Sequence, residues 1–354
     1  MTDVRSPGRR LVLVGNPDSV HIGSHLAEAA AAAGYHMRFE DVRVAYDASA
    51  WRQRIDWWLC GRRPSRLRQF SAAVVEVCRS FRPEWMVSTG LAPIEAGALE
   101  AIGTLGVRRM SYLTDDPWNR AHRAGWFMSA LPLYDAVFSP RRANLEDLRR
   151  LGCRRICYLP FAYAPSLHYP DPPATPDEVE AFSSDVVFAG GADADRVPYV
   201  QALLQAGFTV ALYGGYWERF RPTRPHTRGH ADPVALRKAI GGAKVALCLV
   251  RRANRDGHAM RSFEVPAVGA CMLVEDTDEH RAMFGEPGRA VVYFRAVDEM
   301  VQTMGRLRDD PAERERLARE AHRLIVGGHN TYRDRLLAML EPTCVAVTAG
   351  PGPS

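Results

Sequence analysis

Short apolar segments and helical segments alternate through most of the chain. Each apolar run of the first half is short and bounded by glycine or polar residues, as a buried strand is. Strands are predicted at residues 11–15, 85–88, 109–113, 135–139 and 156–159, and helices between them at 24–33, 67–80, 94–104 and 144–151. Strands that alternate with helices form a parallel sheet covered on both faces, so the predicted fold class is α/β.

A proline-rich segment interrupts this alternation. Five prolines stand between residues 165 and 176 without any periodicity, which favours a linker. Beyond it, strands are predicted at 185–190, 208–213, 244–250 and 270–274, with helices at 195–205 and 233–240. A chain of 354 residues can bury two cores. We therefore expect two Rossmann-like domains at 1–164 and 178–325, a linker at 165–177, a C-terminal helix at 326–341 and a disordered tail at 342–354.

Two carboxylates eight positions apart, Asp256 and Glu264, stand before the last of these strands. Pro266 is tolerated only near the start of a helix, so a helix begins close to Ser262 or Phe263 and Glu264 lies in its first turn. Helix N-termini attract phosphates, and a carboxylate there can accept hydrogen bonds from ribose hydroxyls. The stretch indicates a sugar-phosphate site; the alternative is an aspartate in a turn and a glutamate that starts an ordinary helix.

Glycines follow two of the predicted strands. Gly190 and Gly191 end the strand at 185–190 and precede Arg196, and Gly214 follows the next strand. Consecutive glycines let backbone N–H groups approach a diphosphate, and an arginine can add a bidentate charged contact. The alternative is a glycine turn with a surface arginine.

These pieces, in this order, resemble the retaining glycosyltransferases of the GT-B fold. A carboxylate, seven residues and then Glu264 are similar to the E-x7-E signature of those enzymes, although Asp256 replaces the first glutamate. The motif Arg261-x-Phe263-Glu264-x-Pro-Ala-x-Gly more closely resembles the CgeB/YkvP-like branch, as do residues 112–117 and 329–335. The resemblance covers most of the chain and is strongest from residue 185 to about 337.

The resemblance implies two facing Rossmann-like domains and transfer of a sugar from a nucleotide-diphosphate sugar to an acceptor hydroxyl. Asp256 would position the donor sugar, and Glu264 would hold the ribose. The implied donor-binding residues are Gly190, Gly191, Arg196, Gly214, His230, Arg261, Ser262 and Phe263. The reaction would be retaining and would need no metal or cofactor besides the nucleotide sugar. The resemblance does not identify the nucleobase or the sugar of the donor, or the acceptor (glycan, lipid-linked, protein or small molecule).

Candidates for the acceptor side lie in the first domain. Asp115 and Asp116 follow a predicted strand, and His21 and Gly23 belong to the first loop. Ligands of parallel sheets sit at the carboxyl ends of strands. An inverting reaction would need a base in this domain, and either aspartate or His21 could serve.

A non-catalytic function is the main rival. The shorter Asp256 favours a sugar-nucleotide-binding or envelope- or spore-assembly protein on a degenerate GT-B scaffold. Arg196, Arg261 and Glu264 favour the enzyme.

Residues 51–70 are both aromatic and basic. They include three tryptophans and six arginines: Trp51, Trp57, Trp58, Arg52, Arg54, Arg62, Arg63, Arg66 and Arg68. A helix here would place Trp51, Ile55, Trp58 and Leu59 on one side. This side either packs on its own domain or contacts an acceptor or a membrane surface. Asp56 and the apolar positions interrupt the basic face that a nucleic-acid site needs.

Localisation is predicted from what the sequence lacks. The N-terminus has no apolar core of a signal peptide, and no apolar run is long enough to span a bilayer. The seven cysteines have no paired spacing, which favours reduced thiols. We expect a cytoplasmic protein whose net charge of +5 permits an anionic ligand.

Overall fold

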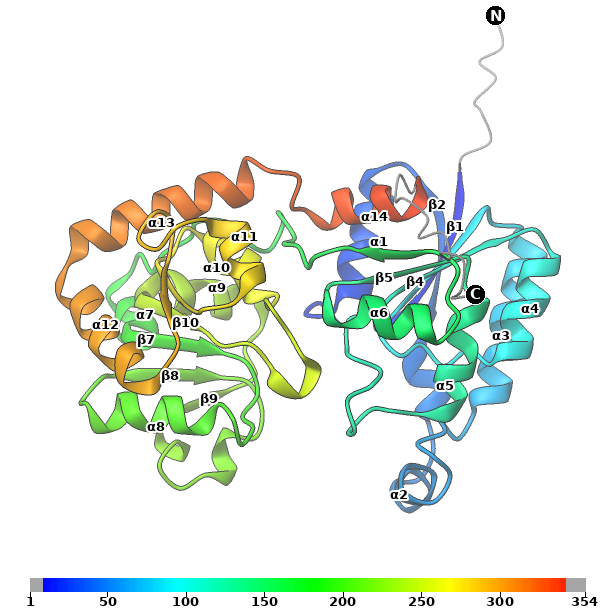
Figure 1. Cartoon of the computed structure of the whole chain (residues 1–354), viewed down its shortest axis with the longest axis horizontal. Helices are drawn as coiled ribbons and strands as arrows, with labels where there is room; N and C mark the ends of the chain where they lie inside the picture. The colour runs from blue at the N-terminus through cyan, green and yellow to red at the C-terminus, as the bar shows by residue number, and fades with distance from the viewer. Residues whose placement is uncertain (1–8, 342–354) are drawn as a thin grey trace, which may run out of the picture. The chain divides into compact units, whose positions relative to one another are not determined.

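The computed structural model describes residues 9–341 as two compact α/β units. Unit 2 is the continuous segment Phe161–Thr331. Unit 1 combines the residues before it with the last helix, which begins at Tyr332 (Figure 1). The chain therefore passes between the units twice.

Unit 1 is built on a six-stranded parallel sheet in the order β2-β1-β3-β4-β5-β6. The strands are β1 (Arg10–Gly15), β2 (His36–Asp41), β3 (Trp85–Thr89), β4 (Arg108–Tyr112), β5 (Ala136–Ser139) and β6 (Ile156–Tyr158). Every residue of β1 after Arg10 is buried, because the strand has neighbours on both sides and helices above and below. The alternation in the sequence thus gives the predicted parallel sheet.

The described helices of unit 1 bury residues along one face, except for the second of them, which buries none. They are α1 (Ile22–Ala32), α2 (Ala50–Trp58), α3 (Leu67–Phe81), α4 (Ala96–Thr104), α5 (Gly125–Ala130), α6 (Ala143–Arg150) and α14 (Tyr332–Leu340), with short 3-10 turns η1 (Val42–Tyr46) and η2 (Leu131–Leu133). Helix α3 buries Phe70, Val74 and Cys78, spaced as one helical face. It packs against α4, while α14 packs against α1 (Figure 1).

Unit 2 repeats the architecture with the order β12-β11-β10-β7-β8-β9, all parallel. Its strands are β7 (Ser184–Ala189), β8 (Val210–Tyr213), β9 (Thr227–Gly229), β10 (Ala243–Cys248), β11 (Met272–Glu275) and β12 (Val292–Phe294). The strand order reverses between β7 and β10. Parallel sheets bind ligands at the carboxyl ends of strands beside such a reversal.

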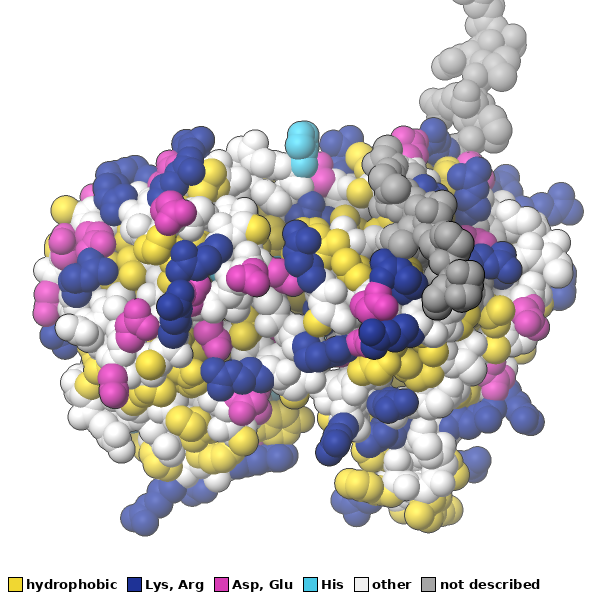
Figure 2. Space-filling model, viewed as in Figure 1, with side chains coloured by type: hydrophobic (Ala, Val, Ile, Leu, Met, Phe, Trp, Pro, Cys, Tyr) yellow, Lys and Arg dark blue, Asp and Glu magenta, His cyan; other side chains and the backbone are white. Residues whose placement is uncertain are grey.

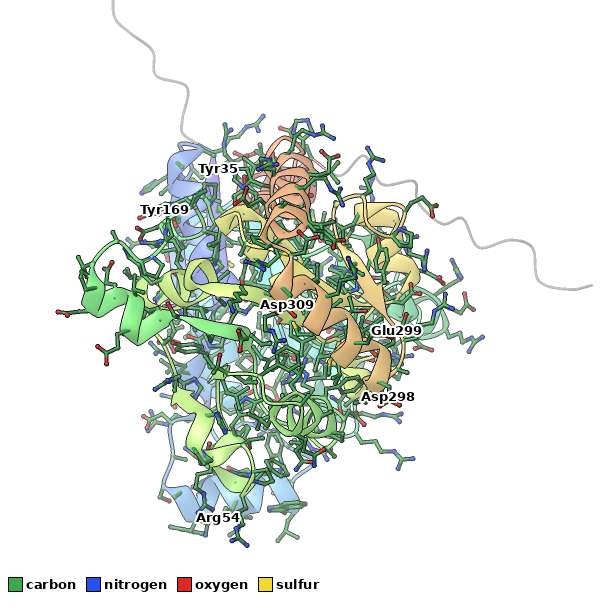
Figure 3. All side chains as sticks on the ribbon, turned by 90° about the vertical axis from the view of Figure 1, so that its left-hand side faces the viewer. Tyr35, Arg54, Tyr169, Asp298, Glu299 and Asp309 are labelled. Carbon is green, nitrogen blue, oxygen red and sulfur yellow. The ribbon has the colours of Figure 1, made fainter. Side chains whose placement is uncertain are left out.

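The helices of unit 2 are α7 (Pro176–Phe182), α8 (Val197–Gln205), α9 (Pro233–Gly242), α10 (Arg261–Val268), α11 (Asp278–Phe284), α12 (Val297–Asp309) and α13 (Pro311–Val326), with 3-10 turns η3 (Trp217–Arg219), η4 (Arg224–His226) and η5 (Arg252–Asn254). Asp298 and Glu299 lie in the first turn of α12, where carboxylates stabilise the helix dipole (Figure 3). Gly269 ends α10 in the left-handed conformation at φ 81°, as the sequence predicts.

Several details differ from the sequence-based prediction. The end of the expected linker is helical, because Thr175 and Glu178 form a capping box that starts α7. The segment 326–341 is not one helix: α13 ends at Val326, Gly327 and Gly328 break it, and α14 starts at Tyr332. The expected disordered tail at 342–354 lies outside the described residues.

Most of the described cysteines lack a disulfide bond. Cys60, Cys78, Cys153, Cys248 and Cys271 are free. Cys157 is disulfide-bonded, so the expectation of reduced thiols is wrong at this position. Within residues 9–341, none of the helices is long and apolar enough to cross a membrane.

Candidate functional site

The strand reversal of unit 2 brings together several of the predicted donor-binding residues. Gly190 and Gly191 follow β7, and Arg251 lies after β10. The Arg196 guanidinium joins the two strand ends, since it donates to the Gly191 carbonyl oxygen at 3.1 Å and to that of Leu249 at 3.4 Å. Arg196 therefore fixes the geometry of the loops at this point.

Arg196 is buried beneath the site. Its guanidinium carbon lies 5.6 Å from the centre of the Phe188 ring. Burial lowers the pKa of Arg196, and the neighbouring positive charge of Arg251 lowers it further, while Asp193 and Asp256 counteract this. With two donors engaged by main-chain oxygens, Arg196 is held in place before any ligand binds.

Arg251 and Arg261 are more exposed than Arg196. The Arg261 Nε donates to the Ala189 carbonyl oxygen at 3.2 Å, which ties the start of α10 to the end of β7. Arg251 pairs with Asp193 at 3.8 Å. Its guanidinium lies 3.8 Å from the point where a Cβ on Gly191 would be. Arg251 was missed by the sequence reasoning, although its position just after a central strand could have identified it.

The backbone of the loop after β7 offers a hydrogen-bond donor near the arginines. The Gly190 and Ala192 N–H groups donate to the carbonyls of Tyr213 and Gly215, whereas the Gly191 N–H makes no backbone or side-chain hydrogen bond within residues 9–341. A main-chain donor beside two arginines favours a negatively charged ligand.

Gly214 allows the glycine loops to touch. Its φ is +127°, and a Cβ there would lie 2.5 Å from the Gly190 carbonyl oxygen. That oxygen also accepts from the Trp217 indole at 2.8 Å. His230, exposed after β9, reaches this loop as well, because its Nε2 would be 3.3 Å from a Cβ on Gly215.

We expect Gly214→Ala to lower the melting temperature and to weaken anion binding, because it adds both backbone strain and a clash with Gly190. The cost should be roughly 1–3 kcal/mol for the strain and more for the clash. Gly207→Ala is the matched control: it has φ +83° but open space around the added Cβ. Equal losses in the two variants, measured by thermal unfolding, would mean that the contact with Gly190 is unimportant.

Glu264 lies in the first turn of α10, as predicted, and its side chain is buried. Its carboxylate forms an ion pair with Arg261 and lies 3.7 Å from the His168 Nε2. His168 Nδ1 accepts from the Ala164 N–H, so Nε2 carries the proton that faces the carboxylate. Glu264 thus holds Arg261, the less buried residue of the pair, at the end of β7.

Asp256 lies partly buried in the loop between β10 and α10. The preceding residue, Arg255, takes the left-handed conformation, and the Asp256 N–H donates to the Arg251 carbonyl at 3.2 Å. The Asp256 charge also acts on Arg196. Asp256 therefore belongs to the same group as Arg196 and Arg251.

Buried hydrogen bonds of His258 stabilise the loop between β10 and α10. His258 Nε2 accepts from the Phe161 N–H, and its Nδ1 lies 2.5 Å from Glu279. The Glu279 side chain passes over Gly257, where a Cβ would clash at 2.4 Å. Glu279 comes from α11, which the sequence reasoning did not predict.

Ser262 and Phe263 were predicted to bind the donor, but both are buried. The Ser262 hydroxyl accepts from the Ala259 N–H and lies 2.8 Å from His280 Nε2, while the Phe263 ring packs on His258. Their contacts order the start of α10 and the loop before it.

His280 gives unit 2 a pH dependence. Burial lowers its pKa to about 4. The unfolded chain has an ordinary histidine value of about 6.5, so it binds more protons between these values, and stability is lost as the pH falls from about 6.5 to 4. The difference corresponds to about 3 kcal/mol of unfolding free energy.

We expect His280→Asn to flatten the dependence of the unfolding free energy on pH, measured by urea unfolding. His226→Asn, a partly exposed histidine, should leave it unchanged, and an unchanged slope in the first variant would contradict the assignment.

The acceptor-side candidates lie in unit 1. Asp116 is fully buried and accepts from the Trp118 N–H and from the Asn144 amide, both at 2.9 Å. Asp115 is partly exposed and is the better placed of the two to meet a ligand. His21 is the exposed N-cap residue of α1, whereas Gly23 is buried against Asn16 with no room for a side chain.

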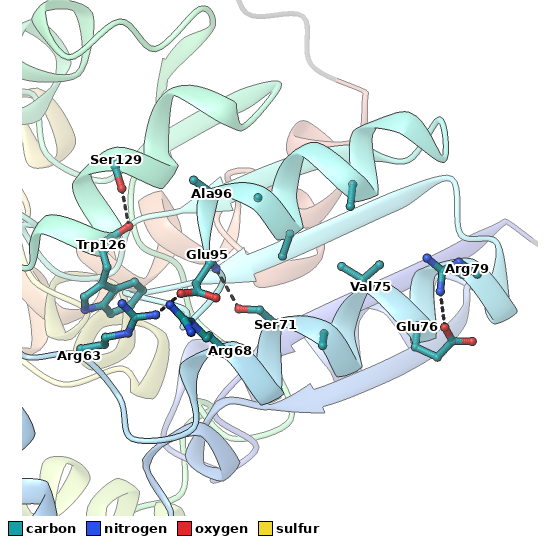
Figure 4. Close-up of a pocket in the computed structure, with 14 residues that line it drawn as sticks. Arg63, Arg68, Ser71, Val75, Glu76, Arg79, Glu95, Ala96, Trp126 and Ser129 are labelled. Atoms are coloured by element: carbon teal, nitrogen blue, oxygen red, sulfur yellow. Dashed lines mark hydrogen bonds and ion pairs between the residues drawn. The ribbon is translucent and has the colours of Figure 1, made fainter.

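A large hollow of unit 1 contains none of the predicted site residues. Its volume is about 890 Å³, and it lies between α3, α4 and α5 (Figure 4). Arg63, Arg68 and Trp126 line one part of it, and Arg63 pairs there with Glu95.

Among residues 9–341, no cluster of three or more His, Cys, Asp or Glu side chains is arranged to hold a metal ion.

Comparison with known proteins is informative for the second half of the chain. Residues 196–341 match a family described as glycosyl transferase-like. The match covers α8 to α14, and so includes Arg251, Asp256, Arg261 and Glu264. No curated protein sequence matches the chain. The closer resemblance to the CgeB/YkvP-like branch stays a prediction.

Solved structures match nearly the whole chain. A sucrose-phosphate synthase from Thermosynechococcus elongatus has a TM-score of 0.67 at 12% identity, covering 94% of this chain and 98% of its own. Anabaena HepE in complex with UDP-glucose has a TM-score of 0.64 at 10% identity, with 94% and 99% covered.

A trehalose-6-phosphate synthase, solved in a study of glycosyl transfer with retention, has a TM-score of 0.61 at 13% identity, with 94% and 98% covered. At these identities the likeness shows the fold. Together the comparisons show the GT-B fold for the chain and, for residues 196–341, similarity to a glycosyl transferase-like family.

Proposed function

We propose that the chain transfers a sugar from a nucleotide-diphosphate donor to an acceptor hydroxyl, with retention of anomeric configuration and without a divalent metal. The observation that carries the proposal is that two arginines lie at the end of β7, at the strand reversal of unit 2: Arg251 beside Gly191 and Arg261 on the Ala189 carbonyl. In the reaction, the bond from the anomeric carbon to the diphosphate breaks and a bond to the acceptor oxygen forms. The acceptor hydroxyl gives its proton to the departing diphosphate, which leaves as nucleoside diphosphate.

Arg251 and Arg261 supply the positive charge that the departing diphosphate needs. Negative charge grows on the diphosphate as the sugar leaves, so fixed cations stabilise the transition state more than the ground state. Arg196 positions the Gly191 loop, and the Gly191 N–H donates to a phosphate oxygen. Two arginines and a main-chain donor can do this without a metal ion.

Asp256 and Glu264 bind different parts of the donor. Asp256, partly exposed beside the arginines, positions hydroxyls of the sugar. Glu264 accepts from the ribose and holds Arg261 through their ion pair. Retention is supported by the E-x7-E-like spacing and by the fold shared with the trehalose-6-phosphate synthase.

UDP-sugars are the first donors to test, because HepE, a structural neighbour, was solved with UDP-glucose. Thermal unfolding with UDP-, GDP- and dTDP-sugars should identify a stabilising donor, and a hydrolysis assay with that donor should release nucleoside diphosphate. Both results should persist in EDTA. Loss of binding in EDTA with recovery in magnesium or manganese would overturn the metal-independent mechanism.

A binding protein without activity is the second candidate. It is favoured by Asp256, whose shorter side chain replaces the family's first glutamate. Stabilisation by a nucleotide sugar with no hydrolysis and no transfer to any acceptor would support this function instead. The Asp256→Glu variant then tests whether side-chain length alone is responsible.

A further inference from the structure

Helix α2 is attached to unit 1 by its polar side. The Gln53 amide donates to the carbonyls of Tyr46 and Ala48 at 2.9 and 3.0 Å, and Asp56 accepts from the Ser65 hydroxyl. Trp57 lies under the Arg62 guanidinium, 5.6 Å from its carbon. With about 100° per residue, these three positions share one side of the helix.

The opposite side of α2 is apolar and faces solvent. Trp51 is 66% exposed, Ile55 39%, Trp58 77% and the following Leu59 80%. No residue of α2 is buried, so the interpretation that its apolar side packs on its own domain is wrong. Figure 2 shows hydrophobic side chains gathered with basic ones where Figure 1 places α2. Surface helices normally bury this side, so an exposed face of this kind is typical of a binding surface.

Positive charge borders the apolar face. Arg52 and Arg54 lie on its two flanks, both exposed and without an ion pair among the described residues; Arg54 points away from the ribbon in Figure 3. Arginines continue along the chain toward α3, where Arg63 and Arg68 line the 890 Å³ hollow (Figure 4). Residues 50–68 contain six arginines and a single acid, Asp56, which is already bonded to Ser65.

From these observations we propose that α2 docks unit 1 on a bilayer surface that contains anionic phospholipids. Tryptophan and leucine enter the boundary between headgroups and acyl chains, and arginines on both flanks meet lipid phosphates. A protein partner would need no flanking cations on both sides, whereas an anionic lipid surface accounts for the apolar face and the charge together. The inference is independent of the sugar-transfer chemistry.

Co-sedimentation of the full chain with vesicles tests the proposal. The chain should bind phosphatidylcholine vesicles that contain phosphatidylglycerol, should bind pure phosphatidylcholine much more weakly, and should dissociate at high salt. Equal binding to both vesicles, or binding to neither, would overturn the proposal.

Double substitutions in α2 test whether this helix is the surface that binds the vesicles. Trp51→Ser with Trp58→Ser should weaken binding by roughly tenfold or more. Arg52→Gln with Arg54→Gln should weaken it roughly tenfold to thirtyfold at low salt. All four positions are exposed, so the variants should melt like the parent.

Each pair has a matched control elsewhere on the surface. Leu105→Ser with Val234→Ser removes two exposed apolar side chains, and Arg120→Gln with Arg221→Gln removes the same two charges; neither pair should change binding. Equal effects of test and control pairs would refute the assignment to α2. A dimer that the tryptophan pair dissociates, without vesicle binding by the parent, would assign the face to a second copy of the chain and overturn the proposal.

Discussion

Arg251→Ala should lower kcat for sugar transfer by roughly a hundredfold to a thousandfold, the usual cost of removing one preorganised group that stabilises developing negative charge. Arg251 lies beside Gly191, and among residues 9–341 its side chain is held only by a 3.8 Å ion pair with Asp193, so it is available to a diphosphate. The loss should be larger in kcat than in the affinity for nucleoside diphosphate, because charge on the diphosphate grows during the reaction.

Arg252→Ala is the matched control, since it removes the same charge from the neighbouring residue. The Arg252 guanidinium donates to Glu275 at 2.9 Å and to the Tyr199 hydroxyl at 2.8 Å, so it is engaged away from Gly191. We expect its variant to retain nearly full kcat. Similar kcat values in the two variants would show that general positive charge, not the position of Arg251, is what the reaction needs.

Glu264→Gln should weaken nucleoside diphosphate binding roughly tenfold to a hundredfold, because a charged hydrogen bond contributes about 1.5–3 kcal/mol. Isothermal titration with the folded protein measures this directly. Asp256→Asn should keep that affinity and lose transfer, since Asp256 is assigned to the sugar and not to the nucleotide.

Thermal unfolding separates binding from stability in these two variants. Glu264 is buried against Arg261, so some loss of melting temperature accompanies the loss of affinity. A lower melting temperature with unchanged affinity of the folded fraction would make Glu264 purely structural. Equal losses of diphosphate affinity in both variants would contradict the division of roles between the two acids.

The sheet architecture could be predicted from sequence because buried parallel strands are nearly continuous apolar runs. The predicted strands at 11–15 and 244–250 correspond to β1 and β10 within two residues at each end. Edge strand β2 was missed because His36, Arg38 and Glu40 interrupt its apolar pattern. Helix α11 was missed because its short sequence, with Asp278 and Glu279 in the first turn, shows no clear apolar period.

Part of the candidate site could be predicted for the same reason: glycines and charges at strand ends are visible in sequence. Gly190, Gly191 and Arg196 do lie together, and Gly214 touches them. The pairing of His258 with Glu279 could not be predicted, because it joins residues 21 positions apart through a helix that the pattern did not reveal. The exposure of Trp51 and Trp58 could not be predicted from sequence either, because an amphipathic pattern does not show what covers the apolar side of a helix.

The position of α14 has a consequence for synthesis of the protein. Tyr332, Leu336 and Met339 are buried in a helix that packs on α1, although more than 160 residues of unit 2 separate it from the rest of unit 1. On the ribosome, the first half of the chain emerges early but lacks this helix until all of unit 2 has been made. Unit 2 is a continuous segment, so all of its residues have been made before unit 1 is complete. A premature stop just after Thr331 would therefore leave unit 2 complete and unit 1 with an uncovered apolar surface on α1, a target for chaperones and proteases.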